Sequence, residues 1–157
     1  MDLLDITSAV IWVDFFTIAL HKFFDLGRSL DAWYDQFGIV AVMSDSLVII
    51  LGILIAKIFF SGYPLLPTAV VIQLIHDILF YQFVILPVPR GHNRVIDLFK
   101  AYANENSWKI LVADSIMIGS SVLLAEQFAT MKNSIVSFLA LLGIYALTFV
   151  IYTRSPI

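Results

Sequence analysis

Four long apolar stretches limit what this sequence can fold into. They cover about residues 38–60, 66–86, 109–128 and 135–152. The hydrocarbon core of a bilayer is about 30 Å thick, so a helix of about 20 apolar residues can cross it. Apolar residues make up 61% of the 157-residue chain, more than a soluble domain of this length can cover. The sequence therefore predicts an all-α bundle embedded in the lipid bilayer as a multi-pass protein.

A fifth apolar stretch, residues 6–24, is less clear. It is long enough to span, but Asp14 lies near its middle and His21 and Lys22 near its end. It could cross the membrane, or it could lie in the interface as an amphipathic anchor. The prediction is therefore four or five spans, and we favour five.

The positively charged residues predict an orientation, because Lys and Arg accumulate in cytoplasmic loops. Only two of them, Lys57 and Lys132, fall on one side of the predicted spans. The opposite side includes Lys22, Arg28, Arg90, Arg94, Lys100 and Arg154. We therefore expect the C-terminus to be cytoplasmic.

Two parts of the chain resemble each other. Asp45-Ser46 and Asp114-Ser115 are 69 residues apart, and Ala56 and Ala125 keep that spacing. Upstream, residues 27–38 parallel 93–108 after a short insertion, pairing Trp33 with Phe99, and residues 11–16 loosely parallel 74–79. An even number of spans separates equivalent points, so the copies would run in the same direction. We expect one transmembrane domain, 1–157, with repeat units at about 6–60 and 66–129 and an extra span at 134–152; chance similarity of apolar helices is the alternative.

Two short segments follow the spacing of an amphipathic helix. Apolar residues recur at i, i+3, i+4 and i+7 in both, which predicts helices lying flat at the cytoplasmic surface with aromatic side chains at headgroup depth. These residues are Leu30, Trp33, Tyr34 and Phe37 in one segment and Val95, Leu98, Phe99 and Tyr102 in the other. Arg28 with Asp31, and Arg94 with Asp97, are expected to form i, i+3 ion pairs.

Ionisable residues inside the predicted spans are the candidates for function. Asp45 and Asp114 each lie one or two turns inside a span, and Asp77 lies mid-span with Gln73 and His76 beside it. A charged side chain facing lipid at the bilayer centre costs about 2.5–3.5 kcal/mol or more, so these side chains should face protein or water. They could handle protons or ions, or they could form hydrogen bonds that fix helix packing. We nominate no catalytic residue.

Small residues indicate where helices can approach closely. Gly52 and Ala56 are four residues apart, as are Ser115 and Gly119, and the repeat maps the first pair onto Ser121 and Ala125. Such steps are typical of helix–helix contacts in membranes.

Several classes of site are not indicated. The chain has no cysteine, and its three His residues lack a third ligand at metal-binding spacing, so we expect no metal and no other cofactor. The nine Lys and Arg residues are scattered, so we expect no nucleic-acid partner.

The run "LIHDILFYQFVILPVPRGHNRVIDLFKAYANENSWKILVADSIMIGSS", residues 74–121, resembles a family of small multi-pass membrane proteins of large DNA viruses of algae and protists. The resemblance implies a place in the internal membrane of a virion or in membranes of the infected cell. It brings no catalytic residues.

We expect a non-enzymatic membrane component that packs with copies of itself or with other membrane proteins. One alternative is a small proton or cation channel or transporter that uses the intramembrane Asp and His residues. A second alternative is an intramembrane hydrolase with two aspartates as an acid–base pair.

Overall fold

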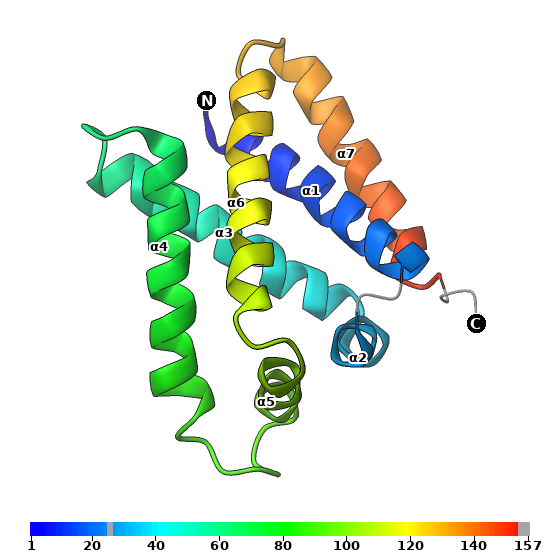
Figure 1. Cartoon of the computed structure of the whole chain (residues 1–157). Helices are drawn as coiled ribbons and strands as arrows, with labels where there is room; N and C mark the ends of the chain where they lie inside the picture. Colours follow the sequence, from blue (N-terminus) through cyan, green and yellow to red (C-terminus); the bar gives the residue numbers. More distant parts are fainter. Residues whose placement is uncertain (25–26, 154–157) are drawn as a thin grey trace.

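The structure, a computed structural model, describes residues 1–24 and 27–153, and that part of the chain is helical with no strand. The elements are α1 (Leu3–Phe24), α2 (Arg28–Phe37), α3 (Ile39–Phe59), α4 (Leu65–Phe80) with a π-helical turn η1 (Tyr81–Ile85), α5 (Arg94–Asn106), α6 (Lys109–Phe128) and α7 (Asn133–Val150). Figure 1 shows α1, α4 and α7 running towards the end where α2 and α5 lie, and α3 and α6 running away from it.

Five helices in the described residues are long and apolar enough to cross a membrane: α1, α3, α4 with η1, α6 and α7. This confirms the predicted helical bundle, and it resolves the number of candidate spans to five. The first of them, α1, is the most buried of the five and packs against α3, α6 and α7. A helix lying in the interface could not make these contacts, so α1 is a central element of the bundle.

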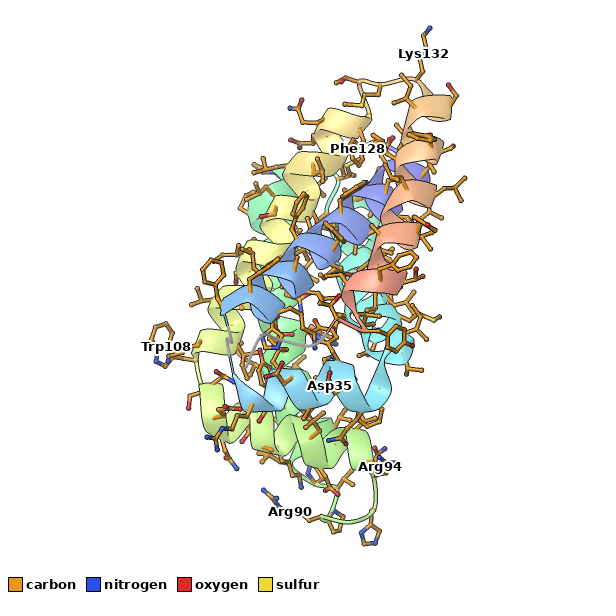
Figure 2. All side chains as sticks on the ribbon, turned by 90° about the vertical axis from the view of Figure 1, so that its right-hand side faces the viewer. Asp35, Arg90, Arg94, Trp108, Phe128 and Lys132 are labelled. Atoms are coloured by element: carbon orange, nitrogen blue, oxygen red, sulfur yellow. The ribbon has the colours of Figure 1, made fainter. Side chains whose placement is uncertain are left out.

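The two short helices α2 and α5 have the predicted amphipathic character and lie across one end of the bundle. They pack side by side (Figures 1 and 2), with the rings of Trp33 and Phe99 4.8 Å apart between centroids. Trp33 and Tyr34 are each only 4% exposed. Both side chains were expected at headgroup depth, but they point into the bundle instead.

The predicted ion pairs within α2 and α5 are wrong. Asp31 accepts a hydrogen bond from His21 Nε2 at 2.9 Å, and Asp97 accepts one from the Gly91 N–H at 2.9 Å. These partners lie outside the helix of each Asp, and within the described residues neither Arg28–Asp31 nor Arg94–Asp97 forms an ion pair. Tertiary contacts and a loop N–H therefore replace the exposed i, i+3 pairs, which contribute only a few tenths of a kcal/mol.

The 69-residue spacing recurs in the backbone. Gly38 and Ser107 both have φ 50°, in the left-handed region, and their N–H groups donate to the carbonyls of Tyr34 and Ala103 at 2.8 and 2.9 Å. The buried faces of α3 and α6 also correspond, at Ile49/Ile118, Gly52/Ser121, Ile53/Val122 and Ala56/Ala125. The spacing thus extends back into α2 and α5, where it pairs Trp33 with Tyr102 and not with Phe99.

Helix contacts repeat in the same way. The contact of α1 with α6 corresponds to that of α4 with α3, and the contact of α1 with α3 corresponds to that of α4 with α6. The unit α1–α2–α3 is therefore built like α4–α5–α6, and α7 is an addition that packs on α1.

The contact between α1 and α7 is tight. Trp12 Nε1–H donates to the Leu139 carbonyl at 3.1 Å, and a Cβ added at Gly143 would lie 2.6 Å from Ile11 Cγ2. Only a residue without a side chain fits there, so Gly143 determines how closely the two helices approach.

Positively charged residues are distributed unevenly between the two ends of the bundle. Arg90 and Arg94 lie at the end occupied by α2 and α5, and Lys132 lies at the other end (Figure 2). Arg154, which contributed to the predicted orientation, lies outside the described residues.

Candidate functional site: an intramembrane acid cluster

Four of the spanning helices each carry an Asp that is buried or half-buried: Asp14 in α1, Asp45 in α3, Asp77 in α4 and Asp114 in α6. The Ser46 hydroxyl, next to Asp45 on α3, donates to Asp14 of α1, and the helices that carry Asp77 and Asp114 pack against each other. We call these four residues the acid cluster. Each comes from a different helix, so their arrangement depends on the folded bundle.

In the first repeat unit, hydrogen-bond donors hold both acids. The Trp33 Nε1–H donates to Asp45 Oδ2 at 3.0 Å, and the Tyr34 hydroxyl donates to the same oxygen at 3.2 Å. The Ser46 hydroxyl donates to Asp14 Oδ2. These bonds join α2 to α3 and α3 to α1.

In the second repeat unit, Asp77 has partners on its own helix. Gln73 Nε2 donates to Asp77 Oδ1 at 2.8 Å, and His76 Nδ1 lies 3.1 Å from the same oxygen. Gln73 is 2% exposed, whereas the side chain of His76 is 44% exposed and stacks on Phe80. The structure thus places Gln73 and Asp77 towards the interior. His76 differs from Gln73 and Asp77, because its ring lies at the surface of the bundle and stacks on Phe80 of the same helix.

Helices α2 and α5 close one end of the acid cluster with tyrosine side chains. Burial raises the pKa of Tyr34, and the carboxyls of Asp45 and Asp14 raise it further. Burial also raises the pKa of Tyr102, with Asp114 and Asp45 as the next causes. Both hydroxyls therefore keep their protons near neutral pH and remain available as donors.

Several buried oxygens of this site have no hydrogen-bond partner among the described residues. They are Asp14 Oδ1, Gln73 Oε1 and Asp77 Oδ2. An unsatisfied buried polar atom costs about 1–3 kcal/mol, so native structures contain few of them. The acid cluster therefore has unused capacity to bind a proton or another donor.

Four of the six predicted packing residues are buried within the helix bundle. Gly52, Ala56, Ser121 and Ala125 are buried, and Gly52 faces Ile118 of α6 and Gln73 of α4. Ser115 and Gly119 are only half-buried, and the Ser115 hydroxyl donates to the Leu111 carbonyl at 2.6 Å. Ser115 thus does not repeat the role of Ser46, although it occupies the equivalent position.

Asp14 was noted in the sequence only as a charge within the first apolar stretch, and Trp33, Tyr34 and Tyr102 were not nominated for this site. Trp33, Tyr34 and Tyr102 were assigned to the membrane surface by their helical spacing, which shows which face is apolar but not what that face contacts. The signal that could have found them is the 69-residue spacing, since it places Trp33 and Tyr102 at equivalent distances before Asp45 and Asp114.

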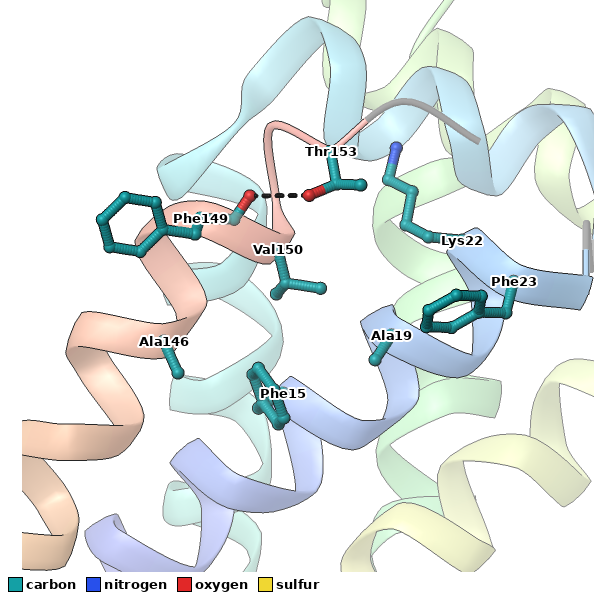
Figure 3. Close-up of a pocket in the computed structure, with 8 residues that line it drawn as sticks. All are labelled: Phe15, Ala19, Lys22, Phe23, Ala146, Phe149, Val150 and Thr153. Carbon is teal, nitrogen blue, oxygen red and sulfur yellow. Dashed lines mark hydrogen bonds between the residues drawn. The ribbon is translucent and has the colours of Figure 1, made fainter. Parts of the chain in front are cut away.

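A separate apolar cavity of about 390 Å³ lies between α1 and α7 (Figure 3). Phe15, Ala19 and Phe23 line one side, and Ala146 and Phe149 line the other. Lys22 also lines it, but its ammonium is paired with Asp35 at 3.1 Å. Its lining therefore offers little chemistry compared with the acid cluster.

Within the described residues, no group of three or more His, Asp or Glu side chains is arranged to hold a metal ion. Comparisons with protein-family models, curated proteins and solved structures give no match. Any function must therefore be argued from the acid cluster itself.

Proposed function

We propose that the chain is an integral membrane protein that binds and transfers protons through the acid cluster. The observation that carries this proposal is that four spanning helices each hold a buried or half-buried Asp, and that oxygens of Asp14 and Asp77 have no hydrogen-bond partner among the described residues. Ionisable residues within spans are costly, and they commonly mark ion pathways and proton relays.

The composition of the acid cluster favours protons over metal ions. Its polar side chains carry carboxyl, amide and phenol groups, each of which can donate or accept a hydrogen bond in a suitable protonation state. The unpartnered oxygens add acceptors in the same place. A single proton can be held between two acceptor oxygens, whereas Ca²⁺ takes six to eight oxygen ligands.

The orientation of the pathway follows from the charges. Arg90, Arg94 and Lys100 belong to the end covered by α2 and α5, and the end of α7 reaches that side because Tyr152 lies beside Gly38. By the positive-inside rule this end and the C-terminus face the cytoplasm. The acid cluster then lies in the cytoplasmic half of the membrane, beneath the two interfacial helices.

A liposome assay tests the proposal. Protein is reconstituted with a trapped pH-sensitive dye, a potassium diffusion potential is imposed, and acidification is followed for the wild type, Asp77→Asn and Glu126→Gln. The last variant removes an exposed carboxyl near the other end of α6. We expect flux well above empty liposomes for the wild type and Glu126→Gln, and flux near the empty-liposome level for Asp77→Asn. Wild-type flux no greater than that of empty liposomes would refute the proposal.

A second candidate is a structural component of a viral or intracellular membrane, which packs with copies of itself or with other membrane proteins. The observation that favours it is that Asp45 joins α3 to α2 through Trp33 and Tyr34. In that case Asp45→Asn lowers stability and changes assembly, measured by thermal unfolding and by the mass of the detergent-solubilised particle, while the wild type shows no proton flux.

A further inference from the structure

We infer that His21 passes protons between the acid cluster and the water at the α2 end of the bundle, and that Asp31 exchanges them with that water. The inference rests on the proposed function and adds the route by which a proton enters or leaves the acid cluster. It starts from a histidine that is completely buried, at the point where a hydrogen bond joins the end of α1 to α2.

One ring nitrogen of His21 is bonded and the other is free. Nε2 lies 2.9 Å from Asp31 Oδ1, whereas Nδ1 is buried and has no hydrogen-bond partner among the described residues. Buried polar atoms without a partner are few in native structures, so each of them calls for a reason. A neutral imidazole that donates from Nε2 keeps Nδ1 as an acceptor. His21 can therefore take up a proton on Nδ1.

Asp31 connects the buried ring with water. The side chain of His21 is 0% exposed and that of Asp31 is 29% exposed, so the Asp31 carboxylate contacts both the imidazole and the solvent. The charged groups beside this pair are Lys22 on α1 and Asp35 on α2, which pair with each other at 3.1 Å. A proton released from Nε2 thus has an acceptor that is open to water.

His21 also shares a buried face of α1 with the acid cluster. It follows Asp14 by seven residues, close to two helical turns, and both side chains are buried. Asp14 Oδ1, like His21 Nδ1, has no partner among the described residues. The two residues are about 10 Å apart along the helix axis, so an intermediate group must carry the proton between them.

Tyr34 of α2 is suited to that step. Its hydroxyl donates to Asp45 of the acid cluster, and its ring lies beside that of His21, with centroids 6.2 Å apart. Water can take part as well, because buried water commonly binds polar atoms that lack a protein partner. Tyr34 therefore links the acid cluster to the imidazole.

The transfer conserves charge on the ring. A proton from the acid cluster bonds to His21 Nδ1, the proton on Nε2 passes to Asp31 Oδ1, and Asp31 releases it to water. The imidazole is neutral before and after, with its remaining proton on the other nitrogen, and exchange between the two tautomers restores it. The reverse sequence brings a proton in.

Proton flux in the liposome assay tests this route. His21→Gln keeps an N–H that can donate to Asp31, but its amide cannot take up and release a proton. We expect a flux about tenfold or more below that of the wild type, with native helix content and melting temperature. His92→Gln, at an exposed loop position, is the matched control and should retain the wild-type flux. Wild-type flux in folded His21→Gln would overturn the inference.

Two variants of α2 separate proton transfer from helix docking. Asp31→Asn can still accept the His21 hydrogen bond through its amide oxygen but cannot release a proton, so its flux should fall as in His21→Gln. Asp35→Asn weakens the neighbouring link between α1 and α2, which runs through Lys22, and should retain the flux. If Asp35→Asn lowers the flux as much as Asp31→Asn, the docking of α2 explains the loss and the inference fails.

NMR of the histidine ring nitrogens tests the connection to water without using transport. The His21 signals are assigned by their loss in His21→Gln. We expect the Nε2 proton of His21 to exchange with water in the wild type and to exchange more slowly in Asp31→Asn. Equal exchange in the two proteins would show that Asp31 is not the connection to water.

The two readouts distinguish the two proposals. If the wild type conducts protons and folded His21→Gln conducts equally well, the proposed function stands and the inference fails. If the wild type does not conduct but His21 exchanges its proton through Asp31, the exchange site stands and the proposed function fails.

Discussion

Replacing Gly143 with Ala tests how α7 is held against α1. The added Cβ would lie 2.6 Å from Ile11 Cγ2 and 3.3 Å from Trp12 Nε1. The optimal separation of two carbon atoms is about 3.5–4.0 Å, so one helix must move by about 1 Å. Ile11 cannot rotate away easily, because a β-branched side chain has one strongly preferred rotamer in a helix.

The cost follows from two terms and one offset. Overpacking costs about 1–3 kcal/mol, and loss of the Trp12 hydrogen bond to the Leu139 carbonyl, 3.1 Å in the native protein, costs about 0.5–1.5 kcal/mol. Ala gains up to about 1 kcal/mol over Gly in helix propensity. We expect the variant to lose about 1–3 kcal/mol of stability.

Unfolding in mixed micelles, titrated with a denaturing detergent and followed by tryptophan fluorescence, measures this loss. Gly119→Ala is the matched control, because its Cβ would meet only Val70 Cγ2 at 4.0 Å. Gly52→Ala should lie between them, since its Cβ would meet the end of the Ile118 side chain at 3.1 Å. If Gly119→Ala destabilises as much as Gly143→Ala, close approach is not what makes Gly143 necessary.

Three further substitutions have definite expected outcomes. Ser107→Gly should raise stability by about 1 kcal/mol in the same titration, because Ser107 holds a φ of 50° that glycine adopts without strain. Tyr34→Phe should lower stability by about 1–3 kcal/mol at neutral pH, since Asp45 loses a donor. Because the folded-state pKa of Tyr34 is raised, the stability that Tyr34 contributes is present below about pH 10 and is lost as the pH rises further. In a pH-dependent melting series, the melting temperature of the variant should therefore fall less above about pH 10 than that of the wild type. Glu105→Gln should make the stability of the protein less sensitive to acid. Hydrogen bonds from the Ser29 side chain and backbone lower the pKa of Glu105, so Glu105 stabilises the start of α2 above its unfolded pKa of about 4.3 and stops doing so as the pH falls through its folded-state pKa. Melting temperatures measured from about pH 7 to about pH 3 would detect the difference between the variant and the wild type.

Much of the fold could be predicted from the sequence because membrane helices are determined by local composition. The stretch 109–128 matches α6 at both ends, and the other predicted spans differ from the observed helices by a few residues. The two interfacial helices were also identified from spacing alone. For the spans the deciding interaction is between a helix and lipid, which the residues of that helix specify by themselves. For the two short helices the spacing identified the apolar face, and the structure packs that face against other helices.

The acid cluster could be predicted only in part, because it depends on contacts between helices. Asp45, Asp77 and Asp114 were recognisable from the cost of placing them in lipid. That Trp33 points at Asp45 follows from how α2 docks on α3, and spacing along one helix does not encode docking. The partner of Asp31 could not be predicted for the same reason: Asp31 pairs with His21 of another helix, in a contact made only in the folded chain, and not with the neighbouring Arg28.

The acid cluster also shows why similar repeat units need not have similar chemistry. The backbone fixes equivalent positions in the two units, as Gly38 and Ser107 demonstrate with the same φ and the same type of hydrogen bond. The side chains then differ: Tyr34, whose hydroxyl donates to Asp45, is replaced by Ala103 at the equivalent position. Two donors on α2 hold Asp45, whereas the amide that donates to Asp77 belongs to the same helix as Asp77. The repeated fold thus gives each unit two acids, and the differences between the units determine which donors hold each of them.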